Sequence, residues 1–268
     1  ADRGHPDLGW RYLDRWLEIA GDYEGVALLR FYFTYRAMVR AKVRRLRAAQ
    51  LAPGAERDAT LSRYRSYLDL ARDAARPPRP ALVVTHGLSG SGKTAVTDAL
   101  VERTGAIRVR TDVERKRLAG LAPASGSASK VGEGLYADAA TRATYERALA
   151  LALAVADAGH LAVVDGTFLR RWQRDRAREA AAAAGLPFAV LDFSAPEPTL
   201  RARIAARAQA GTDASEADLA VLAHQQATAE PLAEDERGGV VPYDASAPLE
   251  RARDAATWRP LERALGRS

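Results

Sequence analysis

A short glycine-rich segment limits the folds available to this chain more than any other feature. Residues 87–94 read GLSGSGKT and fit the pattern GxxxxGK[ST], which ordinary residue frequencies produce by chance in roughly one chain in a hundred of this length. The apolar run at 81–85 predicts a buried strand before the segment, and the pattern at 93–103 predicts a helix after it. This strand–loop–helix context confirms the motif and predicts an α/β fold around it.

The residue types in this segment suit the binding of a nucleoside triphosphate. Glycines allow backbone N–H groups to surround a phosphate without clashes from Cβ atoms, and the N-terminus of the next helix attracts negative charge. Lys93 is expected to reach the β- and γ-phosphates, and the hydroxyl of Thr94 to bind Mg²⁺. We therefore predict ATP and Mg²⁺ as cofactors. The predicted nucleotide-binding residues are Gly87, Leu88, Ser89, Gly90, Ser91, Gly92, Lys93 and Thr94.

Two aspartates follow apolar runs that predict strands. Asp112 comes after the run at 106–109, and Asp165 comes after the run at 160–164. The carboxyl ends of parallel strands share one edge of a sheet, where ligands bind. One carboxylate could therefore accept the proton of an attacking hydroxyl, and the other could hold Mg²⁺ or its waters. The structural alternatives are a helix N-cap for Asp112 and a turn residue for Asp165.

Arginines follow the fourth apolar run. Arg203 and Arg207 are four residues apart in a predicted helix, so they share one face. Two guanidinium groups on one face could stabilise the charge that spreads over a phosphoryl group in the transition state. We predict these two arginines, together with Lys93 and Asp112, as catalytic residues. The alternative is a solvated basic face.

The rest of residues 81–268 alternates short apolar runs with helical patterns. Further strands are predicted at 188–193 and 239–243, and further helices at 113–119, 136–158, 169–184 and 198–210. Strands that alternate with helices predict a parallel sheet covered by helices on both faces.

Residues 1–76 have a different pattern, with helices predicted at 8–20, 23–50 and 55–76. Residues 77–80 read PPRP, and proline ends a helix because it lacks the N–H group. We divide the chain into a helical segment (1–76), a proline-rich linker (77–80) and an α/β domain (81–268). The net charge of +6 belongs to residues 1–80, which hold 16 Lys+Arg minus 10 Asp+Glu, whereas the rest holds 24 minus 24. We therefore do not expect nucleic acid as a partner.

Composition excludes several kinds of site. The chain has no cysteine, which excludes disulfides and thiolate catalysis, and its four histidines lack metal-ligand spacing. No apolar stretch reaches the roughly 18 residues of a membrane span, and no signal-peptide pattern opens the chain. We expect a cytoplasmic protein without a membrane partner. The chain begins with Ala1, as a processed chain or a fragment would.

Residues 81 to about 250 resemble the small P-loop (AAA-type) kinases related to gluconate kinase and zeta-toxin-like kinases. The resemblance rests on HGLSGSGKT at 86–94, RVRTDVERKRLAG at 108–120, VVDGTFLRR at 163–171, LRARIAAR at 200–207 and GTDASEADLAVLAHQQ at 211–226. It implies a P-loop kinase core with a five-stranded sheet and a mobile lid, Asp112 as the candidate base, and Arg203 and Arg207 as lid arginines; whether Asp112 or Asp165 is the base stays open. Many relatives have alanine at the position of Gly166, a change that leaves Asp165 in place.

Residues 9–50 resemble the last helices of an aminoglycoside-phosphotransferase-like domain, which precedes this kinase in two-domain relatives. The stretch GDYEGVALLRFYFTYRAMVRAKV at 21–43 carries the resemblance, but the HxD loop and downstream metal aspartate of that fold are absent. The resemblance implies a remnant or fragment and a missing N-terminal domain as a partner. We assign no catalysis to residues 1–76.

We interpret the chain as a kinase that transfers the γ-phosphoryl group of ATP to a hydroxyl of a small molecule. The alternatives are a polynucleotide 5′-hydroxyl kinase, a zeta-like nucleotide-sugar kinase and an ATP-gated interaction module. The acceptor pocket is expected from 112–145 and 165–178, with Asp112, Arg115, Asp165 and Arg171 as acceptor-binding residues. The cations Arg110, Arg115, Lys116, Arg170, Arg171 and Arg174 lie in or beside these stretches. They favour an anionic acceptor such as a sugar acid, although surface arginines explain them equally well.

Overall fold

The centre of the molecule is a five-stranded parallel sheet with the strand order β2-β3-β1-β4-β5. The computed structural model describes residues 4–76, 79–123, 125, 137–210, 215 and 217–267. All four strand pairings are parallel, which confirms the predicted fold class. The strands are β1 (Ala81–His86), β2 (Ile107–Arg110), β3 (Leu161–Asp165), β4 (Phe188–Ser194) and β5 (Val240–Asp244).

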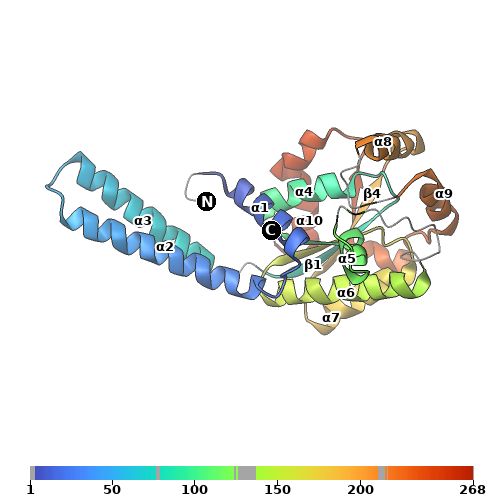
Figure 1. Cartoon of the computed structure of the whole chain (residues 1–268), viewed down its shortest axis with the longest axis horizontal. Helices are drawn as coiled ribbons and strands as arrows, with labels where there is room; N and C mark the ends of the chain where they lie inside the picture. The colour runs from blue at the N-terminus through green and yellow to red at the C-terminus, as the bar shows by residue number, and fades with distance from the viewer. Residues whose placement is uncertain are drawn as a thin grey trace.

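Helices cover both faces of the sheet because both faces are apolar. In β1, Leu82 and Val84 pack on one side, and Ala81 and Val83 pack on the other. Helices α6 (Asp138–Asp157) and α7 (Arg171–Ala183) cover the first side, and α4 (Lys93–Thr104) and α10 (Ala255–Ala264) cover the second. The layers are visible in Figure 1. Helix α10 is not among the predicted helices.

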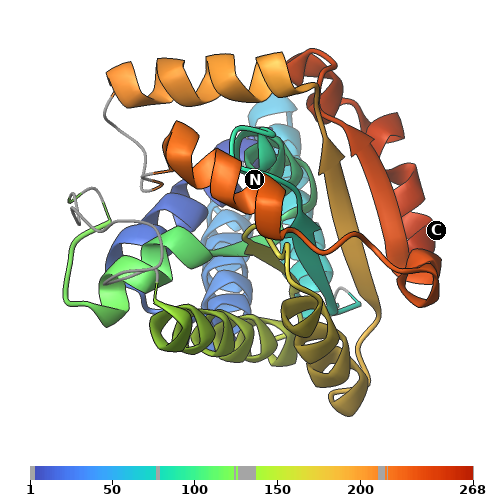
Figure 2. The same ribbon diagram turned by 90° about the vertical axis from the view of Figure 1, so that its right-hand side faces the viewer.

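The carboxyl ends of the strands face a region that two further helices cover. β1 lies between β3 and β4, so the loop after it opens at the point where the strand order reverses. Helix α8 (Glu197–Ala210) follows β4, and α9 (Leu219–Thr228) comes next in the chain. Figure 2 shows both helices across this end of the sheet. The predicted lid segment at 211–215 lies outside the described residues except for Ser215.

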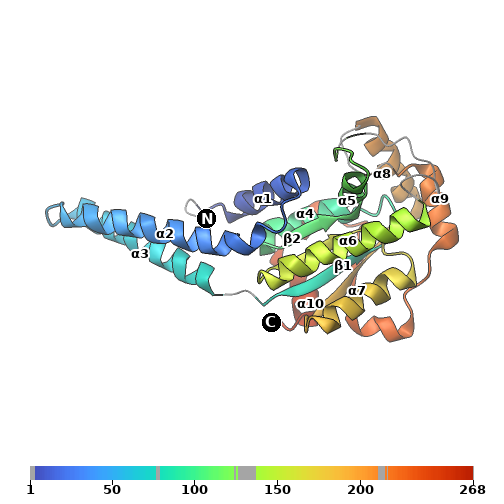
Figure 3. The ribbon, with the colours of Figure 1, turned by 60° about the horizontal axis from the view of Figure 1, so that its bottom comes forward.

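The three helices predicted in the N-terminal segment are present, and they fall into two parts. Helices α2 (Val26–Ala49) and α3 (Ala55–Ala75) form a hairpin that extends away from the sheet, whereas α1 (Pro6–Ala20) lies beside α4 and the edge strand β2 (Figure 3). Leu17 and Tyr23 belong to the same core cluster as β1 and α6. The division of the chain at 77–80 stays a prediction, and Pro77 and Pro78 lie outside the described residues.

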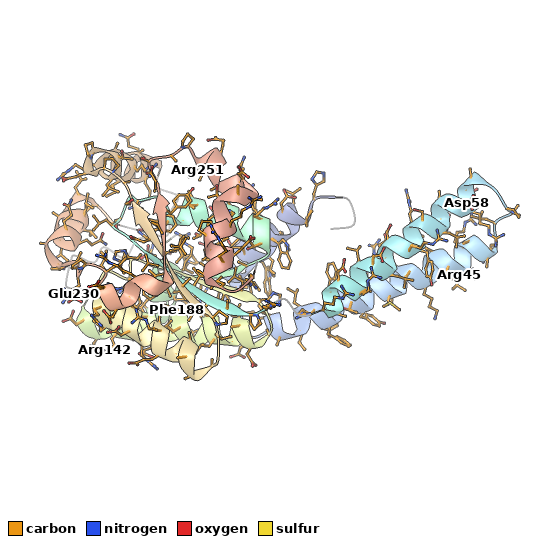
Figure 4. All side chains as sticks on the ribbon, turned by 180° about the vertical axis from the view of Figure 1, so that it is seen from behind. Arg45, Asp58, Arg142, Phe188, Glu230 and Arg251 are labelled. Carbon is orange, nitrogen blue, oxygen red and sulfur yellow. The ribbon has the colours of Figure 1, made fainter. Side chains whose placement is uncertain are left out.

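Much of the aromatic surface of the N-terminal segment is exposed. Tyr12 on α1 and Phe31, Tyr32 and Tyr35 on α2 are each more than half exposed. Figure 4 places Arg45 and Asp58 on the outer part of the hairpin, far from Arg142 and Glu230 at the opposite end of the molecule. Within the described ranges, no helix has the length and apolar character needed to cross a bilayer.

Candidate functional site

A cavity of about 850 Å³ lies at the carboxyl edge of the sheet. It is lined by the glycine-rich loop, by the beginnings of α4 and α5 (Thr111–Leu118), by the loop after β3, and by α6, α8 and α9. The structure therefore brings most of the predicted site residues together. Those that line the cavity are Ser89, Gly90, Gly92, Lys93, Thr94, Asp112, Arg115, Asp165, Arg203 and Arg207.

Two glycines of the loop occupy positions where a side chain does not fit. Gly87 has a φ of +138° and Gly90 a φ of +82°. A Cβ atom at Gly87 would lie 2.6 Å from the carbonyl oxygen of Phe193, and one at Gly90 would lie 2.6 Å from that of Leu200. The loop thus packs directly on the backbone of β4 and α8, which explains the need for glycine.

Lys93 is buried at the centre of this loop. Its ammonium group donates hydrogen bonds to the carbonyl oxygens of Gly87 and Leu88, both at 2.8 Å, and to Oγ of Ser91 at 3.3 Å. Burial lowers the pKa of Lys93 to about 8, although the attraction of Asp165 and Asp112 raises it. A phosphate would provide charged oxygen acceptors for the same ammonium group.

The oxygens of Thr94 and Asp165 are adjacent. Oγ1 of Thr94 donates to Oδ2 of Asp165 at 2.8 Å. Mg²⁺ prefers oxygen ligands and keeps several waters, so this pair suits a magnesium ion that also binds phosphates. Among the residues that the structure describes, no group of three or more His, Cys, Asp or Glu side chains could hold a metal.

Asp112 is not the N-cap of the next helix, and Asp165 is the last residue of β3. Helix α5 begins at Thr111 with Arg110 at the N-cap position, so Asp112 lies within the first turn and lines the cavity. The carboxylate of Asp165 contacts Thr94, and its carbonyl oxygen accepts a hydrogen bond from Oγ1 of Thr111 at 3.2 Å. Both aspartates therefore lie at the site, whereas their chemical roles stay predictions.

Two of the three arginines on α8 face the cavity. Arg203 donates through Nη2 to the carbonyl oxygen of Ala245 at 2.8 Å, and its buried Nη1 has no hydrogen-bond partner among the described residues. Arg207 donates to the carbonyl oxygen of Ala217 at 2.7 Å. Arg201 instead pairs with Glu197 at the surface. Arg203 and Arg207 therefore lie on one face of α8, as predicted. Arg201 lies on the solvent-exposed surface, as the alternative of a basic surface face would have it.

The expectation that Arg171 faces the acceptor is wrong. Arg171 does not line the cavity, and its guanidinium group pairs with Asp235 at 2.6 Å and with Asp175 at 3.2 Å on the surface. It is the first residue of α7, whereas Arg170 precedes the helix and lines the cavity. The side chains of consecutive residues at a helix start point in different directions, which the sequence pattern did not resolve.

Two further cations from the predicted cluster also lie away from the cavity. Arg174 is fully buried and pairs with Glu236 at 2.7 Å, while it also donates to the carbonyl oxygen of Phe168 at 3.0 Å. Lys116 is buried and donates to the carbonyl oxygen of Pro123 at 3.1 Å. These contacts hold α7 and α5 in place, so neither cation supports the prediction of an anionic acceptor.

The sequence reading missed Arg142, a cavity-lining cation on α6. Its guanidinium carbon lies 4.6 Å from the ring centroid of Trp172. On the facing helix α5, Arg115 donates to Oγ1 of Thr141 at 3.1 Å. Arg115, Arg142 and Arg170 therefore line the end of the cavity between α5, α6 and α7. Thr141, Arg142 and Tyr145 follow helical spacing, but the predicted helix alone does not show which face meets the cavity.

The loop after β3 is held in a strained conformation. Phe168 has a φ of 45°, which is uncommon for a bulky residue. Its ring packs edge-to-face on Tyr145, with 4.9 Å between ring centroids, and its N–H donates to the Tyr145 hydroxyl. That hydroxyl also lies 3.1 Å from Oγ1 of Thr167, which lines the cavity. Burial raises the pKa of Tyr145, so the phenol keeps its proton and can take part in these hydrogen bonds.

Helix α9 lines the cavity and contacts the glycine-rich loop. The backbone N–H of Ser89 donates to Oε1 of Gln225 at 2.9 Å, and Val221, His224 and Thr228 also line the cavity. Gln225 falls within the 211–226 stretch of the resemblance, yet no role was predicted for it. The mobility of the predicted lid stays a prediction.

Comparisons with known proteins identify the family of this chain. The AAA domain family matches residues 82–232. Uncharacterized proteins of Mycobacterium tuberculosis and Mycobacterium bovis are 33% identical over 224 residues, which cover 84% of this chain. The chain spans 44% of the length of these relatives. The resemblance of residues 9–50 to a phosphotransferase-like domain stays a prediction.

Two solved structures of kinases have a similar fold. A sugar kinase from Janibacter sp. HTCC2649 has a TM-score of 0.52 at 24% identity, over 72% of this chain and 99% of that one. The APS kinase of Mycobacterium tuberculosis, solved with AMPPNP and APS, has a TM-score of 0.50 at 22% identity, over 69% of this chain and 99% of that one. At these identities the similarity concerns the fold. Because the family match covers more than half of the chain and begins just before the phosphate-binding loop, this chain belongs to the AAA domain family, and its fold is that of P-loop kinases.

Proposed function

We propose that this protein transfers the γ-phosphoryl group of ATP to a hydroxyl group of a small anionic molecule. One observation carries the proposal: a single cavity unites the Lys93 and Thr94 loop, the carboxylate of Asp112 and the guanidinium group of Arg203. These groups provide phosphate binding, a proton acceptor and a cation for the transferred group. This combination suits phosphoryl transfer to an alcohol better than ATP hydrolysis alone.

In the proposed reaction, Asp112 accepts the proton of the acceptor hydroxyl. The hydroxyl oxygen then forms a bond to the γ-phosphorus, while the bond from this phosphorus to the β–γ bridging oxygen breaks and ADP leaves. Lys93, Arg203 and Arg207 stabilise the negative charge on the phosphate oxygens. The buried Nη1 of Arg203, which has no hydrogen-bond partner among the described residues, supports a role in binding an anion.

Thr94 and Asp165 would hold Mg²⁺ directly or through its waters. Their oxygens are 2.8 Å apart and lie next to Lys93, which matches the oxygen preference of this ion. When bound, Mg²⁺ neutralises charge on the β- and γ-phosphates. The APS kinase of similar fold was solved with AMPPNP, so ATP is the donor to test first.

The acceptor is proposed to bind between α5, α6 and α7. Arg115, Arg142 and Arg170 supply positive charge there, and Trp172, whose ring contacts Arg142, adds aromatic surface to the lining. Asp138 also lines this region, so the acceptor would carry hydroxyl groups in addition to its negative charge. Sugar acids and phosphorylated sugars have both properties.

The test is ADP production from ATP and Mg²⁺ in the presence of sugar acids, phosphorylated sugars and neutral sugars. We expect one anionic compound to stimulate ADP production and to yield a phosphorylated product. Lys93→Ala should reduce turnover to background without a large change in Tm. Arg201→Ala, which alters a surface arginine on α8, is the matched control and should keep normal turnover. ATP hydrolysis that no acceptor stimulates would contradict the proposal and favour an ATP-gated module.

A further inference from the structure

Helix α1 places two carboxylates next to the candidate site. Asp14 and Glu18 are four residues apart, so they share one helix face, and both are buried. Oδ2 of Asp14 lies 2.7 Å from Nη2 of Arg108, and Oε1 of Glu18 lies 2.6 Å from Nη1 of Arg110. Because buried carboxylates are costly without cationic partners, these ion pairs orient α1 on strand β2.

The two arginines extend from α1 to the carboxylate that is predicted to hold Mg²⁺. Arg108 and Arg110 are two residues apart in β2 and therefore point to the same side of the strand. Nη1 of Arg108 lies 4.0 Å and Nε of Arg110 lies 3.8 Å from Oδ2 of Asp165. Both distances exceed that of a hydrogen bond. Asp165 instead accepts the hydroxyl of Thr94 at 2.8 Å.

The charges on α1 balance these cations. Glu18 interacts with Arg110 and, at 2.6 Å, with Arg15. Arg108 has a second carboxylate partner, Asp98 of α4, also at 2.6 Å. If Glu18 loses its charge, the attraction that holds Arg110 on the α1 side disappears, and the guanidinium group is drawn toward Asp165. A direct ion pair there would compete with Mg²⁺ for the Asp165 carboxylate.

We propose that Asp14 and Glu18 are positioning residues for the nucleotide–Mg²⁺ site. By holding Arg108 and Arg110, they keep the carboxylate of Asp165 directed at Thr94 and available to the metal. This inference rests on the proposed function, because it requires Mg²⁺ and nucleotide at that place. Helix α1 lies outside residues 82–232, which match the family. The N-terminal segment therefore contributes to a site whose other residues come from the family domain.

The test compares Mg²⁺-dependent binding of AMPPNP by the full chain and by Glu18→Gln. Replacement of residues behind metal ligands typically weakens metal affinity by about 10- to 100-fold. We therefore expect the Mg²⁺ concentration for half-maximal binding to rise about tenfold, while AMPPNP affinity in EDTA stays unchanged. Glu236→Gln is the matched control, because it breaks another buried ion pair, at 2.7 Å from Arg174. It should lower Tm without changing the Mg²⁺ dependence.

A second variant separates positioning from folding. Glu18→Gln combined with Arg110→Gln removes both charges of this pair, so that Arg110 can no longer approach Asp165, whereas Arg108 keeps its partners Asp14 and Asp98. We expect its Mg²⁺ dependence to return toward that of the unaltered chain. An unchanged Mg²⁺ midpoint in Glu18→Gln, an equal change in Glu236→Gln, or a double variant that keeps the weakened Mg²⁺ dependence would overturn the positioning role alone. Failure of the unaltered chain to bind AMPPNP with Mg²⁺ would overturn the proposed function as well.

Discussion

Replacement of Gly90 by alanine should impair nucleotide binding through a specific contact. Gly90 has a φ of +82°, and a Cβ atom there would lie 2.6 Å from the carbonyl oxygen of Leu200 and 3.1 Å from Cγ1 of Ile204. Both residues belong to α8, the helix that carries Arg203 and Arg207. A displacement of this helix or of the loop would therefore separate the loop from both arginines.

The size of the effect follows from the geometry. A left-handed backbone costs an alanine about 1–2 kcal/mol relative to glycine. Close carbon–oxygen contacts are rarely shorter than about 3.3 Å, so the loop and α8 must separate by about 0.7 Å. Misplacement on the order of 1 Å can cost an enzyme about 10²-fold in rate. We expect AMPPNP to bind at least about tenfold more weakly to Gly90→Ala, which corresponds to about 1.4 kcal/mol.

The assay is AMPPNP titration together with urea unfolding, and Gly185→Ala is the matched control. Gly185 has a φ of +65°, but no described atom lies within 4 Å of the Cβ that alanine would add. Both variants should lose a similar free energy of unfolding from backbone strain, whereas only Gly90→Ala should lose nucleotide affinity. Equal AMPPNP affinities in the two variants would refute the contact argument.

Three further predictions concern catalysis and pH. Asp112→Asn should lower kcat on the order of 10²–10⁴-fold with little change in AMPPNP affinity. Steady-state kinetics that show a normal kcat and weakened nucleotide binding would instead indicate that Asp112 belongs to the metal site. Arg203→Ala should lower kcat by about 10²-fold or more through lost charge stabilisation, and the same kinetics should show no effect of Arg201→Ala, whose guanidinium group pairs with Glu197 at the surface. Burial and the nearby Arg30 lower the pKa of His160 to about 4 from 6.5, so the unfolded chain takes up a proton first as pH falls. The free energy of unfolding should therefore drop between about pH 6.5 and pH 4, by up to about 3 kcal/mol from this group. Urea unfolding at several pH values should show a smaller drop in His160→Gln than in the unaltered chain. An identical drop in both would exclude His160 as the cause.

The local parts of the site were predictable because they depend on neighbouring residues. The segment at 87–94 follows a strand and opens a helix as predicted, and the resulting sheet is parallel. Asp112 and Asp165 were placed at the same edge by a rule that holds for all parallel sheets. The spacing of Arg203 and Arg207 was enough to place both on one face. In each case the relevant distance along the chain is short, or the fold class alone sets the geometry.

The remaining parts depend on helix rotation and on contacts between distant segments. Arg171 and Arg170 are adjacent in sequence, yet only Arg170 lines the cavity, because the start of α7 determines which side chain points inward. Arg142 was not predicted because contacts with other helices and with the sheet determine which face of α6 meets the cavity.

The position of α1 is the largest difference between what the sequence predicts and what the structure shows. The sequence by itself determined a nucleotide-binding loop, a parallel sheet and a helical N-terminal segment. Only the tertiary structure brought Glu18 to Arg110, across 92 residues of chain. The spacing of Asp14 and Glu18 on an amphipathic helix does not predict which cations they pair with. Two carboxylates removed from water require cationic partners. Strand β2 supplies them, because Arg108 pairs with Asp14 and Arg110 pairs with Glu18 next to Asp165.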